Sequence, residues 1–157
     1  MRFLPRIRTG RDLFFVHIFA AMSRVLCLDV GKKWIGVAVT DPLQISVNGL
    51  ETVNTEHLFD FLSSYLRDEE VVKIVMGLPR HADGSVTALQ PLIERIDKWI
   101  GKHFPEVVIE FEDESFSSKE ARELMFAAAL PKKKRANKKM VDQVSAVLIL
   151  QQHLKHR

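Results

Sequence analysis

The feature that most constrains the fold is an apolar strand that ends in a carboxylate, within residues 24–41. Residues 25–28 are apolar, Asp29 follows them, and Gly31 opens a tight turn into a second apolar run at residues 34–40. This pattern predicts two strands joined by a short turn. Burying a carboxylate is costly unless a cation or hydrogen bonds compensate it. Asp29 therefore indicates either a metal or phosphate site, or an acid that caps the turn through its own hydrogen bonds.

Length and composition favour one ordinary domain. The chain has 157 residues, of which 46% are hydrophobic and 27% charged, as in a soluble globular domain. The single cysteine, Cys27, excludes a disulfide framework and a thiolate zinc cluster and is expected in the core. None of the six histidines forms a ligand pair on a helix face, so each is predicted to be a surface or interfacial residue. The net charge of +3 and pI of about 9.1 lean toward a polyanionic partner.

The first residues of the chain differ from the rest. Four arginines precede an apolar run at residues 13–21, namely Arg2, Arg6, Arg8 and Arg11. This order resembles a secretory signal, but the run contains His17, leads to no convincing cleavage site and is too short to span a membrane. We predict that residues 1–22 are an N-terminal extension, poorly packed or disordered, with Met22 as an alternative start, and that residues 23–157 form the folded domain.

Hydrophobic periodicity predicts the remaining elements. An extended segment at residues 45–53 completes three strands with hairpin-length connections, which we expect to be antiparallel. A nearly all-apolar run at residues 71–76 is typical of a strand in a parallel sheet, and residues 107–111 form the next strand. Helices are predicted over residues 56–67, 85–100, 117–130 and 137–154. The fold class is therefore α/β, with a mixed sheet of three antiparallel strands and two parallel additions.

Acidic residues follow the last predicted strand without a spacer. Asp113 and Glu114 come after Glu112, so they lie at the carboxyl end of that strand, where ligands collect in open parallel sheets. Ser117 and Glu120 then form a capping-box pattern at the start of the next helix. The alternative interpretation is a solvated turn, with one acid satisfying N–H groups at the helix terminus.

A third acid, Asp142, interrupts the last helix, which is apolar on nearly every side. Small residues, Ser145 and Ala146, stand beside it on the same helical face, so the helix can approach the sheet closely with a carboxylate directed at it. The alternative is an early-turn acid favoured by the helix dipole. Acids that converge from Asp29, from Asp113 or Glu114, and from Asp142 repel one another unless cations bridge them. Bridging Mg²⁺ or Mn²⁺ would support phosphodiester hydrolysis.

A strongly basic run, KKKRANKK, lies between the last two predicted helices. Its charged members are Lys132, Lys133, Lys134, Arg135, Lys138 and Lys139. A run without large apolar residues cannot order by burial, so we predict a mobile loop that binds a phosphate backbone. A targeting signal and a simple solvated loop are the alternatives.

In order and spacing, four motifs resemble the YqgF family of ribonuclease H-like nucleases. They are DVGKKWIGVAVTDP at residues 29–42, GLPRHADGS at 77–85, DESFSSKEA at 113–121 and VDQVSAVLILQQHL at 141–154. The resemblance implies a ribonuclease H-like domain with helices on both faces of the sheet, a divalent metal, a cytoplasmic setting and processing of the 5′ end of pre-16S ribosomal RNA. The family's acids fall on Asp29, on Asp113 and Glu114, and on Asp142.

The chain departs from the family pattern at Ser115, where the family usually has Arg directly after the acidic pair. Lys32, Lys33 or the basic run would then supply the missing charge to the nucleic acid. Trp34 is expected to pack at the start of its strand, with stacking on a base as the alternative. Two other functions stay open, a Holliday-junction resolvase acting on DNA and a non-catalytic RNA-binding factor in ribosome assembly. A third alternative is a nucleotide-dependent kinase of the actin and hexokinase type, but the length of the chain argues against it because such folds need two lobes.

Overall fold

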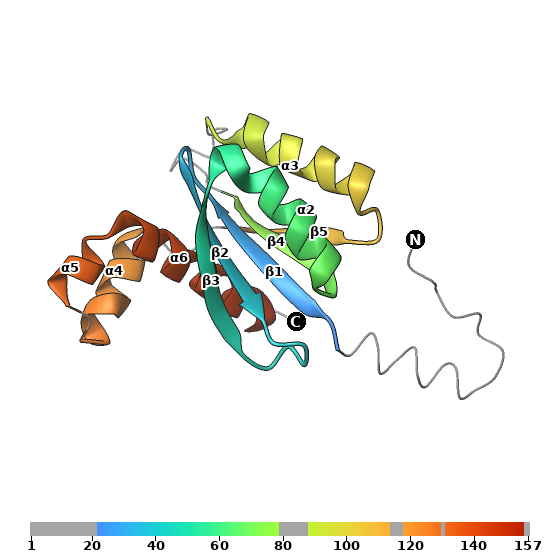
Figure 1. Ribbon diagram of the computed structural model, residues 1–157. Coiled ribbons are helices and arrows are strands. Elements are labelled where there is room, and N and C mark those ends of the chain that lie inside the picture. Colours follow the sequence, from blue (N-terminus) through green and yellow to red (C-terminus); the bar gives the residue numbers. More distant parts are fainter. Residues whose placement is uncertain (1–21, 79–87, 114–117, 130, 156–157) are drawn as a thin grey trace.

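A five-stranded mixed sheet forms the centre of the molecule (Figure 1). The computed structural model describes residues 22–78, 88–113, 118–129 and 131–155. The strands are β1 (Arg24–Val30), β2 (Trp34–Thr40), β3 (Val47–Asn54), β4 (Val71–Leu78) and β5 (Val108–Asp113), in the order β3-β2-β1-β4-β5. β1 to β3 pair antiparallel, whereas β4 pairs parallel with both β1 and β5. The predicted sheet is confirmed. Residues 1–21 of the predicted N-terminal extension lie outside the described residues, so the boundary of the extension stays a prediction.

Helices cover both faces of the sheet (Figure 1). They are the short 3-10 helix η1 (Thr55–His57), α2 (Leu58–Asp68), α3 (Gln90–His103), α4 (Ser118–Ala127), α5 (Lys132–Arg135) and α6 (Lys138–Lys155). α2 and α3 pack on one face and α6 on the other, as the resemblance implied. α4 packs against α6, and Figure 1 shows α4 and α5 extending beyond the sheet. Within the described ranges, no helix has the length and apolar character needed to cross a membrane.

The two cores arise from the alternation of side chains along the strands. Leu26 and Leu28 of β1 face α2 and α3, and Val25 and Cys27 face α6. Apolar residues three or four positions apart cover the first core, namely Leu58, Leu62 and Leu66 of α2 and Ile93, Ile96 and Ile100 of α3. Ala146, Ile149 and Leu150 of α6 cover the second. β1 is therefore apolar on both sides and, as predicted, Cys27 lies buried in the core.

Element ends differ from the sequence prediction where polar side chains or special dihedrals intervene. β3 begins at Val47 rather than at residue 45, because the Asp41 carboxylate accepts hydrogen bonds from the N–H groups of Ile45 (2.8 Å) and Ser46 (2.6 Å) and holds that stretch as a loop. α4 ends at Ala127 rather than near residue 130, and Ala129 has the left-handed φ of 53° that is typical after a helix end. The predicted helix starts at Ser85 and Ser117 lie outside the described residues.

α6 touches the sheet at two glycines. A Cβ atom at Gly36 of β2 would overlap the carbonyl group of Asp142, and one at Gly49 of β3 would lie 2.8 Å from Cγ of Gln143. The obstacle at Gly36 is main chain, which cannot rotate away, whereas the Gln143 side chain can. Gly36 therefore sets how closely α6 approaches β2.

We expect Gly36→Ala to lower the free energy of unfolding by about 1–3 kcal/mol, because the added methyl group must push the α6 backbone away from the sheet. Gly101→Ala is the matched control, since no atom lies within 4 Å of a Cβ at that exposed position in α3. The control should be stabilised by about 0.5–1 kcal/mol, as expected for Gly to Ala in a helix. Urea denaturation measures both values. Equal stability of the Gly36 variant and the wild type would contradict the close approach.

Candidate active site

Asp29 lies one residue before the end of β1, directly opposite Gly36 of β2. Opposite residues in an antiparallel pair project from the same face of the sheet, and the face of Gly36 carries α6. Asp29 therefore lies on the α6 face, two residues beyond Cys27, which packs beneath α6. It is only partly buried, whereas Cys27 is fully buried. The apolar row under α6 thus ends in a carboxylate at the edge of the sheet.

Asp142 lies near the start of α6, and its main chain rests on Gly36. Because Gly36 is the register partner of Asp29, the two aspartates belong to neighbouring positions on one face of the sheet. Ser145 and Ala146, one turn further along α6, are buried against the sheet. Their small size allows this approach. The structure therefore places the main chain of Asp142 against the register partner of Asp29, although the two aspartates are more than one hundred residues apart in sequence.

One carboxylate oxygen of Asp142 is buried without a donor. Oδ2 has no hydrogen-bond partner among the residues that the structure describes. Burial raises the pKa of the Asp142 carboxyl above its ordinary value, and the positive charges of Lys138 and Arg122 oppose this rise. A desolvated carboxylate oxygen on the same face of the sheet as a second carboxylate matches the ligands that hard divalent cations prefer. Asp29 and Asp142 therefore fit a site for such a cation.

The remaining predicted acids are Asp113, the last residue of β5, and Glu114, which follows it. Leu28 of β1, Met76 of β4 and Phe111 of β5 are aligned across the parallel strands, so Asp113, the last residue of β5, and Asp29 lie near the same edge of the sheet. The Asp113 side chain and all of Glu114 are outside the described part. Among described residues, no group of three His, Cys, Asp or Glu could hold a metal ion. Asp29 and Asp142 are thus two described members of the predicted set, and the contribution of β5 stays a prediction.

Sequence reasoning missed a polar cluster at the other end of α6. His153 is buried, and its Nδ1 lies 3.0 Å from Oε2 of Glu112 in a hydrogen bond. Its Nε2 lies 3.2 Å from Oε2 of Glu110, an ion-pair distance without hydrogen-bond geometry. Lys73 of β4 also pairs with Glu110. The alternation of Glu110 and Glu112 along β5 was the available signal, because it places both on one face. The cluster ties the end of α6 to the strand that leads into Asp113.

Two groups of predicted basic residues meet at the start of β2. Nζ of Lys139 lies 3.8 Å from the centroid of the Trp34 ring, and Nζ of Lys33 lies 5.9 Å from it. Lys32, Lys33, Lys138 and Lys139 are all exposed. The turn after β1 and the start of α6 therefore lie close together, and the ammonium group of Lys139 lies over the Trp34 ring.

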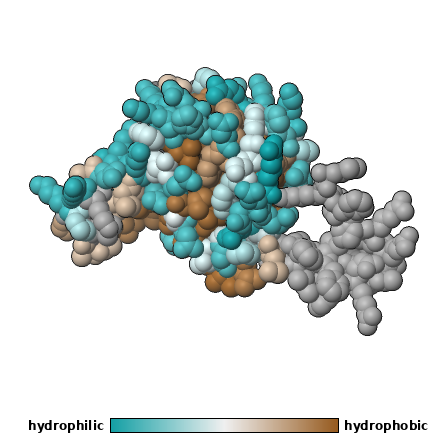
Figure 2. All heavy atoms as spheres, in the orientation of Figure 1, coloured by the Kyte–Doolittle hydropathy of each residue, from teal (hydrophilic) through white to brown (hydrophobic). Residues whose placement is uncertain are grey.

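The basic run itself is not the loop that its composition predicted. Lys132–Arg135 forms the short helix α5, so the prediction of an unstructured loop is wrong for these residues. Lys138 belongs to α6, in agreement with the helix predicted over residues 137–154. Main-chain and capping hydrogen bonds supply order that burial does not: the N–H of Ala136 donates to the carbonyl of Lys132 (3.0 Å), and that of Lys139 donates to Oδ1 of Asn137 (3.0 Å). Lys132 and Lys133 are exposed, and the side chains of Lys134 and Arg135 are outside the described part. Figure 2 shows hydrophilic side chains at the α5 end of the molecule.

Comparison with known proteins identifies the family to which this site belongs. Residues 23–156 match the family model described as RuvX, Holliday junction resolvase. A protein of Bacteroides fragilis is 41% identical over 133 residues, which cover 85% of this chain and 96% of that protein. A protein of Phocaeicola vulgatus is 42% identical over 136 residues, with 87% and 98% covered. Both are named "Putative pre-16S rRNA nuclease". The resemblance to a nuclease family is confirmed.

The buried charge of Asp142 predicts a pH-dependent effect on stability. Because the pKa of Asp142 is raised in the folded state, the carboxyl group loses its proton at a lower pH in the unfolded chain than in the folded protein. Ionisation of Asp142 therefore opposes folding as the pH rises above 3.8. Asp142→Asn should therefore stabilise the protein in chelator at pH 7, by about 1 kcal/mol or less because the residue is partly solvated. The gain should vanish near pH 3. Urea denaturation at the two pH values measures it, and an equal gain at both would contradict a buried carboxylate.

Removing the His153 contacts should loosen α6 from β5. In His153→Leu the shape is roughly kept, but Glu112 and Glu110 lose a buried partner, so we expect a loss of about 1–3 kcal/mol in the free energy of unfolding. His153→Gln is the matched variant, because its amide can still donate to Glu112, and it should lose less. Chemical denaturation orders the three proteins. A leucine variant as stable as the wild type would show that packing alone holds this end of α6.

Proposed function

Because the chain belongs to the RuvX family of Holliday junction resolvases, we propose that it is a metal-dependent endonuclease that hydrolyses phosphodiester bonds and processes the 5′ end of pre-16S ribosomal RNA. The family match covers nearly the whole folded part of the chain. Relatives about 40% identical, matched over at least 96% of their own length, carry a name for this processing activity. The proposal therefore takes both the chemistry and the substrate from full-length relatives.

The buried Oδ2 of Asp142 is the observation that carries the proposal. It is costly for folding, and it lies on the face that carries Asp29. We propose Asp29, Asp142 and Glu114 as ligands of Mg²⁺ or Mn²⁺, with Asp113 as a further catalytic acid. Glu114 is proposed as the ligand because the resemblance places the family's acidic pair on Asp113 and Glu114. When bound, the cation would polarise the phosphodiester and lower the pKa of an attacking water.

The basic residues are proposed to hold the nucleic acid. Lys33 in the turn after β1 and Lys139 at the start of α6 both lie over the Trp34 ring, and α5 directly precedes α6 in the chain. The proposed set is Lys32, Lys33, Lys132, Lys133, Lys134, Arg135, Lys138 and Lys139. Contacts of this kind bind phosphates without reading sequence, so they suit structured RNA of many sequences. The proposed partners are ribosomal precursors, and the proposed setting is the cytoplasm, where these precursors are made.

A second candidate function is resolution of four-way DNA junctions. The description of the matched family favours it, and its hydrolytic chemistry would use the same acids. Symmetric cleavage of a junction needs two sites related by twofold symmetry, which requires a dimer. A non-catalytic assembly factor would instead need the basic residues and would tolerate loss of the acids.

The decisive experiment compares cleavage of a structured RNA spanning the 5′ end of 16S rRNA with cleavage of a four-way DNA junction, in Mg²⁺, in Mn²⁺ and in chelator. Asp29→Asn and Asp142→Asn should each lower the cleavage rate at least about 100-fold, because each removes a charged ligand without changing shape. RNA affinity in chelator should change little. Asp97→Asn, an exposed acid on α3 across the sheet, is the matched control and should cleave normally.

The outcomes separate the candidate functions. Cleavage of the junction in preference to the RNA would favour the resolvase. Wild-type protein that binds RNA tightly but cleaves neither substrate in any metal would favour the assembly factor. Undiminished cleavage by both aspartate variants would remove the proposed metal centre.

A further inference from the structure

We propose that Trp34 is a positioning residue that holds the Lys139 ammonium beside the acidic site, where it binds a phosphate of the nucleic-acid backbone next to the bond that is cleaved. This inference rests on the proposed nuclease function and deepens it. It assigns to one lysine of the basic set a role in catalysis, and to Trp34 a role other than stacking on a base.

The first support is that Lys139 is fixed at several atoms although it is exposed. Its ammonium lies over the Trp34 ring at 3.8 Å from the centroid, a close cation–π contact. Its N–H donates to Oδ1 of Asn137 at 3.0 Å, and its carbonyl accepts from Oγ1 of Thr52 at 2.7 Å. A lysine on a surface helix is normally free to sample many rotamers. In Lys139, hydrogen bonds hold the main chain and the Trp34 ring holds the ammonium group.

The second support is the register between β2 and α6. Trp34 and Gly36 are two residues apart on β2, so they project from the same face. Lys139 and Asp142 are three residues apart on α6, so they are neighbours on one side of the helix. The contact of Lys139 with Trp34 and the contact of Asp142 with Gly36 are therefore consecutive parts of one helix-to-strand packing. The lysine lies about one helical turn, roughly 5 Å along the axis, from Asp142.

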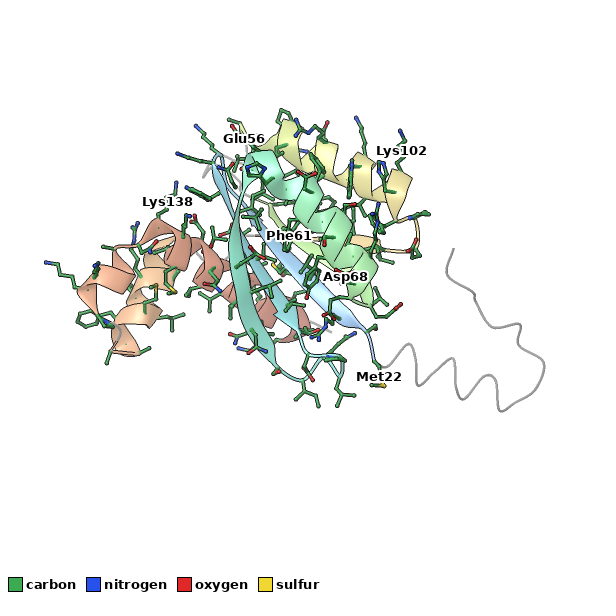
Figure 3. The ribbon with its side chains drawn as sticks, in the orientation of Figure 1. Met22, Glu56, Phe61, Asp68, Lys102 and Lys138 are labelled. Carbon is green, nitrogen blue, oxygen red and sulfur yellow. The ribbon has the colours of Figure 1, made fainter. Side chains whose placement is uncertain are left out.

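The third support is electrostatic. Two carboxylates repel the phosphates of a substrate, so a nuclease needs positive charge close to its acids. Lys33 shares the Trp34 ring with Lys139, and Lys138 directly precedes Lys139 at the start of α6. Figure 3 shows Lys138 at the start of α6, well away from Lys102 at the end of α3. Cations therefore border Asp142 on the side where α6 begins.

The position of Lys139 argues against base stacking by Trp34. The lysine covers a face of the ring, so a base would have to displace it and lose the cation–π contact to stack there. A lysine held in advance loses less rotamer freedom when it binds a phosphate. The ring thus favours binding of phosphate through the lysine.

A double-mutant cycle tests the coupling between the two residues. Lys139→Gln should lower the single-turnover cleavage rate of the structured RNA about tenfold, and should reduce the slope of log affinity against log salt by about 1. Trp34→Leu should lower the rate by a similar factor, and the double variant should be little worse than either single one. Trp34→Phe keeps an aromatic face and should lie between wild type and Trp34→Leu. Lys102→Gln is the control and should match the wild type in rate and slope.

Two results would overturn the inference. Additive losses in the double variant would mean that Lys139 works without Trp34. A loss of RNA affinity on Trp34→Leu that persists in the Lys139→Gln background would mean that Trp34 contacts the nucleic acid directly. Thermal unfolding of every variant, with Trp34→Phe as the milder change, separates these results from misfolding.

The cycle also separates this inference from the nuclease proposal. RNA binding in chelator reports the Lys139 coupling without any cleavage. If the Lys139 and Trp34 variants show coupled RNA affinities but the wild type never cleaves, the nuclease proposal is refuted. Lys139 then remains a phosphate-binding residue that Trp34 positions. Full cleavage with uncoupled residues would refute only the role given to Trp34.

Discussion

The contact between the main chain of α6 and Gly36 is the constraint on which the rest of the structure depends. A helix axis normally stays a full side-chain layer away from a sheet, and only a residue without a Cβ lets main chain meet main chain. That contact places Asp142 against the register partner of Asp29. One carboxylate oxygen of Asp142 is buried and has no hydrogen-bond partner among the described residues, which fits the proposed role as a ligand of a cation. A methyl group at Gly36 would therefore disturb packing and the candidate site together.

α6 connects the working parts of the molecule along its length. Lys139 near its start lies on Trp34, Asp142 lies on Gly36, and the apolar middle of the helix packs on β1 and β4. His153 near its end joins Glu110 and Glu112 of β5, the strand that leads into the remaining acids. A shift of this one helix would move the lysine proposed to bind phosphate, the acid proposed to bind a metal ion and a strand contact at once. Positioning by one rigid element is how separate side chains keep a fixed spacing.

The site illustrates why stability and function oppose each other. Asp142 is destabilising in the metal-free protein because burial disfavours its charge. The same desolvation strengthens its interaction with a bound cation. An asparagine would suit folding better and the proposed chemistry worse. The apolar packing of α6 on the sheet, from Ala146 to Leu150, offsets the destabilising effect of the buried Asp142 carboxylate.

The sequence by itself determined the order of strands and helices, the mixed sheet and the family, because periodicity and turn residues are local signals. It also singled out Asp29 and Asp142 as acids in apolar surroundings. Only the tertiary structure decided that Asp142 packs on the register partner of Asp29, that Lys139 lies on Trp34, and that His153 joins two glutamates, because each contact links residues far apart in the chain. The basic run shows the limit of composition: charge predicted a loop, yet main-chain hydrogen bonds form a helix there, and those bonds depend on geometry rather than on hydropathy.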